Sequence, residues 1–214
     1  MASKKSAEPL DFRYEDSFAP RVVCGTDEAG RGPLAGRVYA AAVILPDEIR
    51  NAPFVAALRD SKKLSPKKRD SLAEDIKRYA PYAVAYSEVE EIERLNILEA
   101  SLLAMRRAVS ALSLSPDVIL VDGNIDRDFP IEAHALIGGD GLSPSVAAAS
   151  ILAKTERDRY CVEVLDVRYP GYGFAVHKGY GTRAHYDALR TLGACEAHRM
   201  SFLKKFYAAN GGKK

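Results

Sequence analysis

The sequence predicts an α/β fold, a single domain in which helices flank a sheet, followed by a helical C-terminal extension. Short apolar runs at 22–27, 38–45 and 117–122 have the length of buried strands. Apolar residues recur at three- and four-residue spacing over 66–79 and 89–112, which is typical of amphipathic helices. Acidic residues beside glycines end several strands, and ligands of open α/β sheets gather at strand carboxyl ends. We therefore expect the functional site where these strands end.

The N-terminal half begins with a hairpin. Strand 22–27 is followed by a glycine-rich loop and then by strand 38–45, and the short link favours antiparallel pairing. A helix then follows over 66–79. Ser65 is a good N-cap for it, and Pro66 suits its first position because proline lacks the N–H that would stay unpaired there.

The middle of the chain predicts a strand and one long helix. Residues 82–89 alternate in polarity well enough to form a strand. Ser87 and Glu90 have the spacing of a capping box, which starts a helix. The leucine and methionine stripe over 89–112 continues at helical spacing without interruption. We interpret this stripe as core packing.

The C-terminal half predicts two more strands and two helices. Four consecutive apolar residues in 117–122 indicate a buried, parallel strand, and 132–137 forms a shorter one that ends in a glycine-rich turn. Ser143 opens a helix that runs to about residue 161. Thr182 caps a further helix over 183–192. The aromatic, glycine-rich loop between these helices suits either loop packing or base and sugar stacking.

Composition is that of an ordinary globular protein. The chain has 214 residues, of which 47% are hydrophobic and 28% charged. We expect a poorly ordered arm over 1–18, one catalytic domain over 19–208 and a flexible tail over 209–214. No apolar run approaches a membrane span, and the polar N-terminus lacks the apolar core of a signal peptide, so we expect a cytoplasmic protein. No oligomer signal is readable, and a monomer is the default expectation.

The net charge of +2 conceals clusters of each sign. The basic cluster, defined as Lys62, Lys63, Lys67, Lys68 and Arg69, falls within eight residues. Charge runs are usually solvated faces. A nearly neutral total with separate basic and acidic clusters also suits a nucleic-acid enzyme that uses cations, without demanding one.

The acidic cluster comes from three strand ends. Its members are Asp27, Glu28, Asp122 and Asp140. Taken singly, each is more often an exposed turn residue. Together they offer only oxygen ligands, which favours Mg²⁺ or Mn²⁺. Two such cations support phosphodiester cleavage without any histidine or cysteine. The three cysteines are widely spaced, which argues against a disulfide framework or a zinc site.

Two other classes of protein would explain part of the pattern. A phosphate-binding NTPase would explain the first glycine-rich loop, but the Gly-x-x-x-x-Gly-Lys-Ser/Thr motif is absent from the sequence. A non-catalytic nucleic-acid module would explain the basic cluster and the tyrosines. It would not explain carboxylates at three strand ends, because unneutralised acids weaken phosphate binding.

Eight stretches, in order along residues 21–203, resemble the ribonuclease HII family. They are GTDEAGRGPLAG from Gly25, DSKKLS from Asp60, VDGN from Val121, GD from Gly139, AAASILAK from Ala147, YPGYGF from Tyr169, HKGYGT from His177 and HRMSF from His198. The first stretch alone is quite specific. One departure is Thr155-Glu156 before Arg157-Asp158, where the family has an apolar or Val-Thr pair.

The resemblance implies a ribonuclease H-like fold, with a mixed five-stranded sheet flanked by helices. It implies cutting of the RNA strand in RNA–DNA hybrids, and incision 5′ to a single ribonucleotide in duplex DNA. The products would carry 3′-hydroxyl and 5′-phosphate ends, and the cellular role would be removal of ribonucleotides from DNA. The expected partners are therefore RNA–DNA hybrid and ribonucleotide-containing duplex DNA, without a membrane.

The resemblance also assigns the metal ligands. By match to the family motif, Asp27, Glu28, Asp122 and Asp140 are the catalytic residues that hold Mg²⁺ or Mn²⁺. Asp158 competes for the fourth place. We favour Asp140 because it follows a strand in a glycine-rich loop, whereas Asp158 lies within a predicted helix.

The same match assigns substrate contacts. The backbone of Gly30, Arg31 and Gly32 would contact the ribose 2′-hydroxyl and the adjoining phosphate. Tyr180 would pack on the sugar beside the scissile junction, with Tyr172 as the alternative stacking residue. The remaining contacts, to phosphates, would come from Ser61, Lys62 and neighbouring basic residues.

Overall fold

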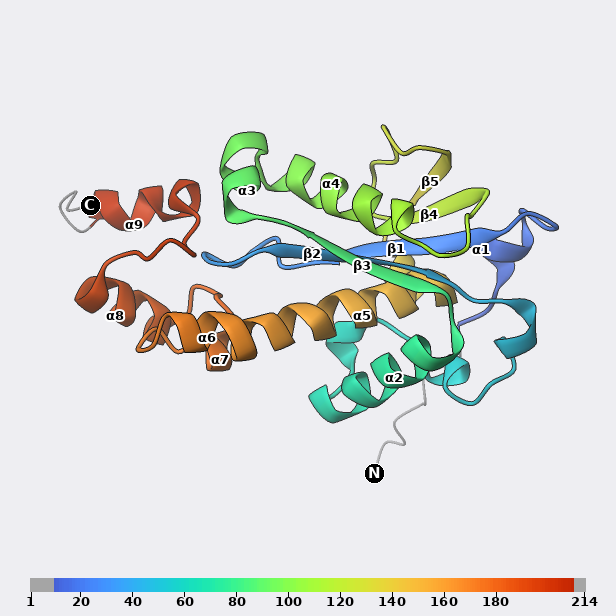
Figure 1. Cartoon of the computed structure of the whole chain (residues 1–214), viewed down its shortest axis with the longest axis horizontal. Coiled ribbons are helices and arrows are strands. Elements are labelled where there is room, and N and C mark those ends of the chain that lie inside the picture. Colours follow the sequence, from blue (N-terminus) through green and yellow to red (C-terminus); the bar gives the residue numbers. More distant parts are fainter. Residues whose placement is uncertain (1–9, 210–214) are drawn as a thin grey trace, which may run out of the picture.

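A five-stranded mixed sheet forms the centre of the protein in a computed structural model that describes residues 10–209 (Figure 1). The strands are β1 (Val23–Ala29), β2 (Val38–Ile44), β3 (Tyr82–Ser87), β4 (Val118–Asp122) and β5 (Glu132–Leu136), in the spatial order β3-β2-β1-β4-β5. Strand β1 pairs antiparallel with β2 and parallel with β4. Strand β5 pairs parallel with β4. The predicted hairpin and the predicted parallel strand are both confirmed.

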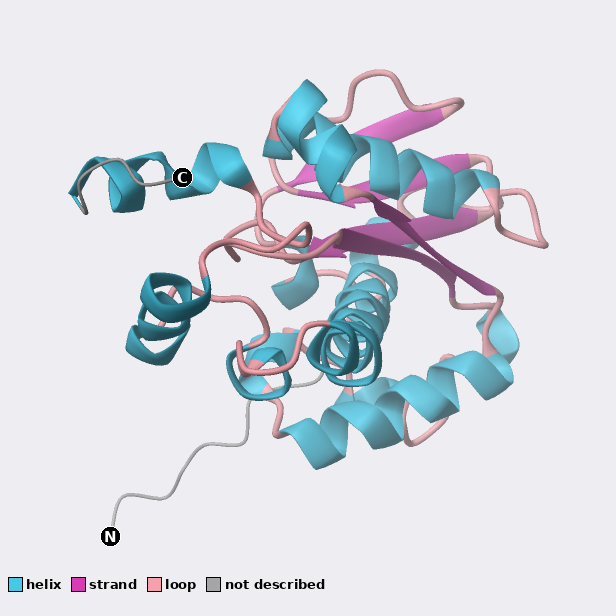
Figure 2. Cartoon of the chain, turned by 60° about the vertical axis from the view of Figure 1, so that its left-hand side comes forward, coloured by secondary structure: helices cyan, strands magenta, loops and turns pink. Residues whose placement is uncertain are grey.

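Helices cover both faces of this sheet (Figures 1 and 2). Strand β2 is buried at every position, so alternate residues meet different helices. Ala40 and Ala42 pack in one core with α4 (Ile97–Ser110). Ala41 and Val43 pack in the other core with α2 (Pro66–Tyr79) and α5 (Pro144–Tyr160). The predicted α/β architecture with a helix-flanked mixed sheet is confirmed.

Helix α2 has the bounds that its capping signals predicted. It begins at Pro66, and the Ser65 hydroxyl accepts a hydrogen bond from Lys68 N at 3.3 Å. Leu72 and Ile76 are fully buried on the face that meets α5. Its first turn carries the exposed Lys67 and Lys68 of the basic cluster, while Lys62 and Lys63 lie in the 3₁₀ turn before it.

The prediction of one helix over 89–112 is wrong. The chain forms α3 (Val89–Leu95) and α4 (Ile97–Ser110), separated by Asn96 with a φ of 72°. Asparagine tolerates this left-handed region better than most residues. Its side chain also caps α4, accepting from Leu98 N at 2.9 Å and Glu99 N at 3.2 Å. The apolar residues keep their helical spacing across Asn96, so the periodicity of the sequence does not reveal the break.

The capping box lies one residue later than predicted. Glu88 is the N-cap of α3, and its N–H donates to the Glu91 carboxylate at 2.9 Å. Ser87 instead ends β3, is fully buried, and donates its hydroxyl to Ala100 O at 2.8 Å. The Ser87 hydroxyl is buried and already donates to Ala100 O, so Glu88 forms the cap instead.

Part of the predicted N-terminal arm is structured. Residues Arg13–Asp16 form the short helix α1, and Glu15 is only 4% exposed. The Glu15 carboxylate accepts from the hydroxyls of Ser143 and Ser145, both at 2.6 Å. A negative charge at the start of α5 is favourable because helix N-termini carry unpaired N–H groups. The boundary at residue 18 is therefore wrong, and residues 1–9 lie outside the described residues.

A helical extension follows α5, as predicted (Figure 1). Helix α5 continues through a π-helical turn, Cys161–Leu165, into α6 (Asp166–Arg168). Then come α7 (Phe174–His177), α8 (Arg183–Leu192) and α9 (Lys204–Ala209). The predicted helix over 183–192 and its Thr182 cap are confirmed. Of the tail predicted over 209–214, residue 209 belongs to α9, and 210–214 lie outside the described residues.

Within residues 10–209, no helix combines the length and the apolar character that a membrane crossing needs.

Candidate active site

Parallel pairing of β1 with β4 sets two carboxylates side by side. The register joins Thr26 to Val121, so Asp27 and Asp122 follow as the next residue on each strand. Neighbouring strands lie about 4.8 Å apart, and residues at equal register point to the same face. Asp27 is 4% exposed, whereas Asp122 is half-buried at the end of β4. The sheet itself therefore brings these two carboxylates together.

Strand β5 brings the turn that carries Asp140. This strand runs parallel to β4, and Gly138 after it adopts a left-handed φ of 68°. The turn is tied to the cluster because Gly139 N donates to Asp122 Oδ1 at 2.7 Å. Asp140 follows in a short 3₁₀ turn, Gly139–Gly141. Three strand ends thus place their acidic residues at one edge of the sheet, as the sequence predicts.

The pKa values show that these carboxylates share one electrostatic environment. Burial raises the pKa of Asp27 well above its usual range, and the charges of Glu28 and Asp122 raise it further. Burial also raises the pKa of Glu28, against the opposing effect of Arg31 at 3.5 Å. Burial and the charges of Asp60 and Asp122 raise the pKa of Asp140. The cluster therefore holds more negative charge than the surrounding protein neutralises.

Lys62 contributes a positive charge to this cluster. Burial lowers its pKa, but the charges of nearby carboxylates outweigh burial and raise it overall. Those carboxylates are Asp27, Asp140, Asp60 and Asp122. One lysine facing four carboxylates leaves a net negative site, which suits a divalent cation.

In this conformation, residues 10–209 contain no group of three or more His, Cys, Asp or Glu side chains gathered closely enough to hold a metal ion. Backbone donors engage two of the carboxylate oxygens. Glu28 N donates to Asp27 Oδ1 at 2.6 Å, and Gly139 N donates to Asp122 Oδ1. The donor set, made only of carboxylate oxygens and carrying uncompensated negative charge, fits Mg²⁺ or Mn²⁺ in chemistry and charge.

Asp158 has other partners. It lies on α5, where its carboxylate accepts from Lys154 Nζ at 2.6 Å and from Arg69 Nη2 at 3.4 Å. The charges of Lys154 and Arg69 already neutralise it, and it is not among the main causes of the raised pKa values of Asp27 and Asp140. Asp158 therefore lies among basic side chains, whereas the charges of Asp60 and Asp122 act on Asp140.

The predicted ribose-contacting residues lie next to each other. Arg31 and Gly32 are exposed in the loop after β1. A Cβ on Gly32 would lie only 3.7 Å from Tyr180 Cε1, so the tyrosine ring borders this loop. Tyr180 is 42% exposed. Tyr172 is buried, stacks on Phe174 at 5.4 Å and donates its hydroxyl to Gly193 O, so it packs the C-terminal extension.

Ser61 and Ser150 connect the basic loop to the carboxylates. Ser61 is 3% exposed, and Ser150 Oγ donates to its hydroxyl at 2.9 Å. Ser150 also lies close to Asp27 and favours its ionised form, which partly offsets the rise in the pKa of that carboxyl. The Ser61 hydroxyl therefore faces inward, while Lys62 and Lys63 are exposed beside it.

Sequence reasoning gave no role to Asp60 or Ser150, although both lie in stretches that carry the family resemblance. The charge of Asp60 raises the pKa of Asp140 and adds negative charge to the cluster. Its position directly before Ser61 and Lys62 was the available signal. Ser150 ends a run of three alanines, which indicates close packing and gives no hint of a carboxylate partner.

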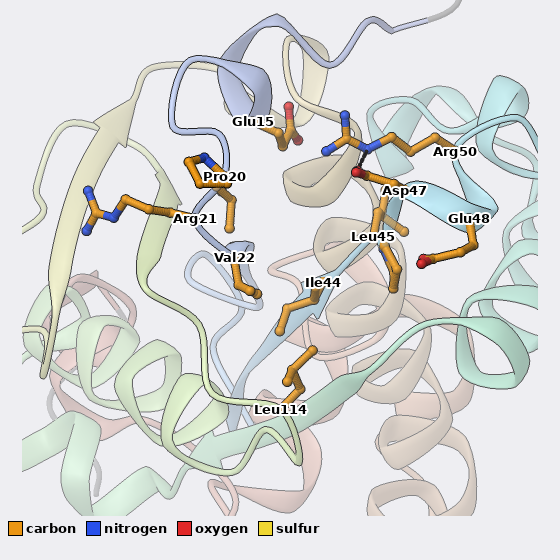
Figure 3. Close-up of a pocket in the computed structure, with 12 residues that line it drawn as sticks. Glu15, Pro20, Arg21, Val22, Ile44, Leu45, Asp47, Glu48, Arg50 and Leu114 are labelled. Atoms are coloured by element: carbon orange, nitrogen blue, oxygen red, sulfur yellow. Dashed lines mark ion pairs between the residues drawn. The ribbon is translucent and has the colours of Figure 1, made fainter.

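A hollow of about 210 Å³ lies at the opposite end of β1 (Figure 3). Val22 and Val23 of the β1 end, Ile44 and Leu45 of the β2 end, and Arg50 are among the residues that line it. None of the predicted catalytic or substrate-binding residues lines it. The candidate active site is therefore separate from this hollow.

Comparison with known proteins agrees with the geometry. The family model described as Ribonuclease HII matches residues 24–205. A curated Ribonuclease HII of Burkholderia vietnamiensis is 55% identical over 196 residues, covering 91% of this chain and 88% of the relative. One from Laribacter hongkongensis is 56% identical over 185 residues, covering 85% and 91%. The solved PCNA:RNase HII complex of Archaeoglobus fulgidus matches with a TM-score of 0.72 and 27% identity, covering 90% of this chain and 98% of that one.

Proposed function

The chain belongs to the ribonuclease HII family and is a ribonuclease H type 2 enzyme, and we propose that it cuts RNA strands in RNA–DNA hybrids and incises 5′ to single ribonucleotides in duplex DNA. The products carry 3′-hydroxyl and 5′-phosphate ends. In the cell this activity removes ribonucleotides from DNA in the cytoplasm. The enzyme works as a monomer on these nucleic acids.

One observation carries the proposal: the buried carboxylate of Asp27 and half-buried carboxylates from the other strand ends lie together, and burial and their mutual charges raise the pKa values of Asp27, Glu28 and Asp140. Their uncompensated charge supports Asp27, Glu28, Asp122 and Asp140 as ligands of Mg²⁺ or Mn²⁺. Bound divalent cations would activate water and stabilise the leaving oxygen of the phosphodiester. Oxygen-only ligands favour these two metals over zinc.

The protein's own groups orient the substrate. Arg31 and Gly32 are exposed, whereas Gly30 is buried behind them, and the glycines on either side of Arg31 let a ribose approach the backbone closely because they have no side chain. The neighbouring Tyr180 ring packs against the sugar next to the junction. The remaining contacts, to phosphates, come from Ser61, Lys62 and the exposed lysines of the basic cluster.

The experiment is cleavage of an RNA–DNA hybrid in chelator, in Mg²⁺ and in Mn²⁺. We expect cleavage only with a divalent cation, and its loss in Asp27→Asn, Asp122→Asn and Asp140→Asn. Asp158→Asn is the matched control, because it removes an equally half-buried carboxylate outside the cluster. Turnover near the wild-type value in Asp140→Asn, with loss in Asp158→Asn, would transfer the fourth position to Asp158.

The same assay separates the alternative classes. A nucleotide-hydrolysing enzyme would release phosphate from nucleoside triphosphates and leave the hybrid intact. A non-catalytic module would bind the hybrid without cutting it in any metal. Either result would overturn the proposal.

A further inference from the structure

Arg199 uses its entire side chain to hold the loop that follows β1. The residue is fully buried between the C-terminal extension and this loop. Its five N–H donors meet four carbonyl oxygens, those of Gly30 at 2.8 Å, Arg31 at 3.0 Å, Pro33 at 2.9 Å and Gly36 at 2.9 and 2.7 Å. A guanidinium has five N–H donors, so none is left for another partner.

This contact decides which way the peptide groups of the loop face. In a trans peptide, the C=O of one residue and the N–H of the next point in opposite directions. Because the carbonyls of Gly30 and Arg31 point inward at Arg199, the N–H groups of Arg31 and Gly32 point away from it. Both residues are exposed, and within residues 10–209 neither N–H has an acceptor. Two adjacent donors are thus presented to solvent.

A second buried arginine supports the same loop. Arg157 of α5 is 1% exposed and donates to Lys178 O at 3.0 Å. A Cβ on Gly30 would lie 2.1 Å from Arg157 Nε, so the loop backbone rests on this side chain. In the described part of the chain, neither Arg157 nor Arg199 forms an ion pair with a carboxylate. Two positive charges therefore stand behind the exposed N–H groups, and an anion or a hydroxyl oxygen is the group they favour.

Burial and the charge of Arg157 lower the pKa of Arg199 to about 9. The guanidinium still carries its proton at neutral pH, as its five hydrogen bonds require. Segment 197–199 adds backbone bonds to the loop, with Arg199 N donating to Leu34 O and Gly36 N donating to Ala197 O, both at 2.8 Å. The C-terminal extension thereby determines the conformation of a loop more than 160 residues earlier in sequence.

We propose that Arg199 is a positioning residue for ribose recognition: by binding the inward carbonyls of the loop, it presents the N–H groups of Arg31 and Gly32 to the 2′-hydroxyl and the adjoining phosphate. Arg157 supports the loop from behind and adds positive charge. The inference rests on the proposed function and deepens it, because it explains how a backbone loop keeps a ribose-specific shape.

The test compares binding of two duplexes that differ by one oxygen. One is a DNA duplex with a single ribonucleotide, and the other is the same duplex in all-DNA form. All proteins also carry Asp122→Asn, so that neither duplex is cut. We expect Arg199→Met to reduce the preference for the ribonucleotide duplex by about two- to tenfold. This is the effect of losing one hydrogen bond between the displaced loop and the 2′-hydroxyl. Arg199→Lys keeps the charge and up to three donors, so its preference for the ribonucleotide duplex should lie between those of the wild type and Arg199→Met.

Leu189→Ala is the matched control, because Leu189 is buried in the same extension, in the core that also holds Leu34 and Ala35, and forms none of the hydrogen bonds to the loop. It should lower the melting temperature and leave the preference unchanged. Arg199→Met with an unchanged preference would overturn the inference and leave Arg199 a purely structural residue. Where Arg199→Met fails to fold, an unchanged preference in Arg199→Lys has the same meaning.

A second measurement does not depend on the proposed function. Amide hydrogen exchange at Leu34 and Gly36 reports on the loop directly, because both N–H groups are hydrogen-bonded. Exchange should accelerate in Arg199→Met and not in Leu189→Ala, and equal rates would overturn the inference. If the protein with Arg199 intact shows no preference between the duplexes, the proposed ribose recognition fails, while exchange still decides whether Arg199 holds the loop.

Discussion

Replacing Gly25 by alanine tests the packing that positions Asp27. Gly25 lies on β1, two residues before Asp27, where α5 crosses the strand. A Cβ at this position would lie 2.3 Å from Ser145 C and from Val146 N, both backbone atoms of α5. Ordinary contact begins at 3.4 Å, so α5 must move by 3.4 − 2.3 = 1.1 Å. No side-chain rotation can relieve a clash with backbone.

The expected cost follows from this displacement. Forcing an extra carbon into a packed core destabilises a protein by about 1–3 kcal/mol, occasionally more. For a domain of this size, each kcal/mol lowers the melting temperature by about 2–4 °C. We therefore expect Gly25→Ala to melt about 2–12 °C below the wild type. Movement of α5 also displaces Ser150 from Asp27, and a misplacement near 1 Å can cost about 100-fold in rate.

Thermal melting by circular dichroism, with cleavage measured well below the transition, checks both effects. Gly141→Ala is the matched control for stability, because a Cβ there meets nothing within 4 Å and its φ is not left-handed. Its melting temperature should be unchanged or slightly raised. If Gly25→Ala melts within about 1 °C of this control, α5 does not pack on β1 as described.

Three further predictions concern charge and the tyrosines. In chelator, Asp27→Asn should melt above the wild type at pH 8, because burial and the charges of Glu28 and Asp122 raise the pKa of Asp27 and make its ionised form unfavourable. Protonation relieves that cost, so the difference should shrink as pH falls through the raised pKa; a difference that grows instead contradicts the sign. Changing the four lysines of the basic cluster to alanine should lower the log–log salt slope of duplex binding by about 0.9 for each phosphate that these lysines neutralise, and an unchanged slope makes the cluster a solvated face. Tyr180→Ala should cut a single-ribonucleotide duplex far less well than Tyr172→Ala at matched folded fraction; the reverse order transfers the sugar contact to Tyr172.

The sequence predicted the bounds of helices that begin with a clear capping signal. Helix α2 has its predicted bounds because Ser65 and Pro66 specify a helix start in any context. The break at Asn96 was missed for the opposite reason: side-chain periodicity does not register a single residue of positive φ within an unbroken apolar stripe. The cap of α3 was misplaced because the choice between Ser87 and Glu88 depended on which side chain the tertiary structure buries.

The carboxylate cluster was predictable, whereas the residues that support it were not. Parallel strands end at one edge of a sheet, so Asp27 and Asp122 had to meet once both strands were assigned. The sequence did not predict the supporting roles of Arg157 and Arg199. Charged residues are almost never fully buried, and sequence alone gives no reason to expect two guanidiniums beneath a loop. Only the fold shows that the distant C-terminal extension holds Gly30 and Gly36.

The most direct test of the proposed activity is the position of the nick in a DNA duplex that contains one ribonucleotide. We predict a single nick on the 5′ side of that nucleotide, only with Mg²⁺ or Mn²⁺, leaving a 3′-hydroxyl and a 5′-phosphate. An all-DNA duplex, and one with a 2′-O-methyl nucleotide at the same position, should remain intact. A nick elsewhere, cutting of the all-DNA duplex, or full activity in chelator would contradict the proposed activity.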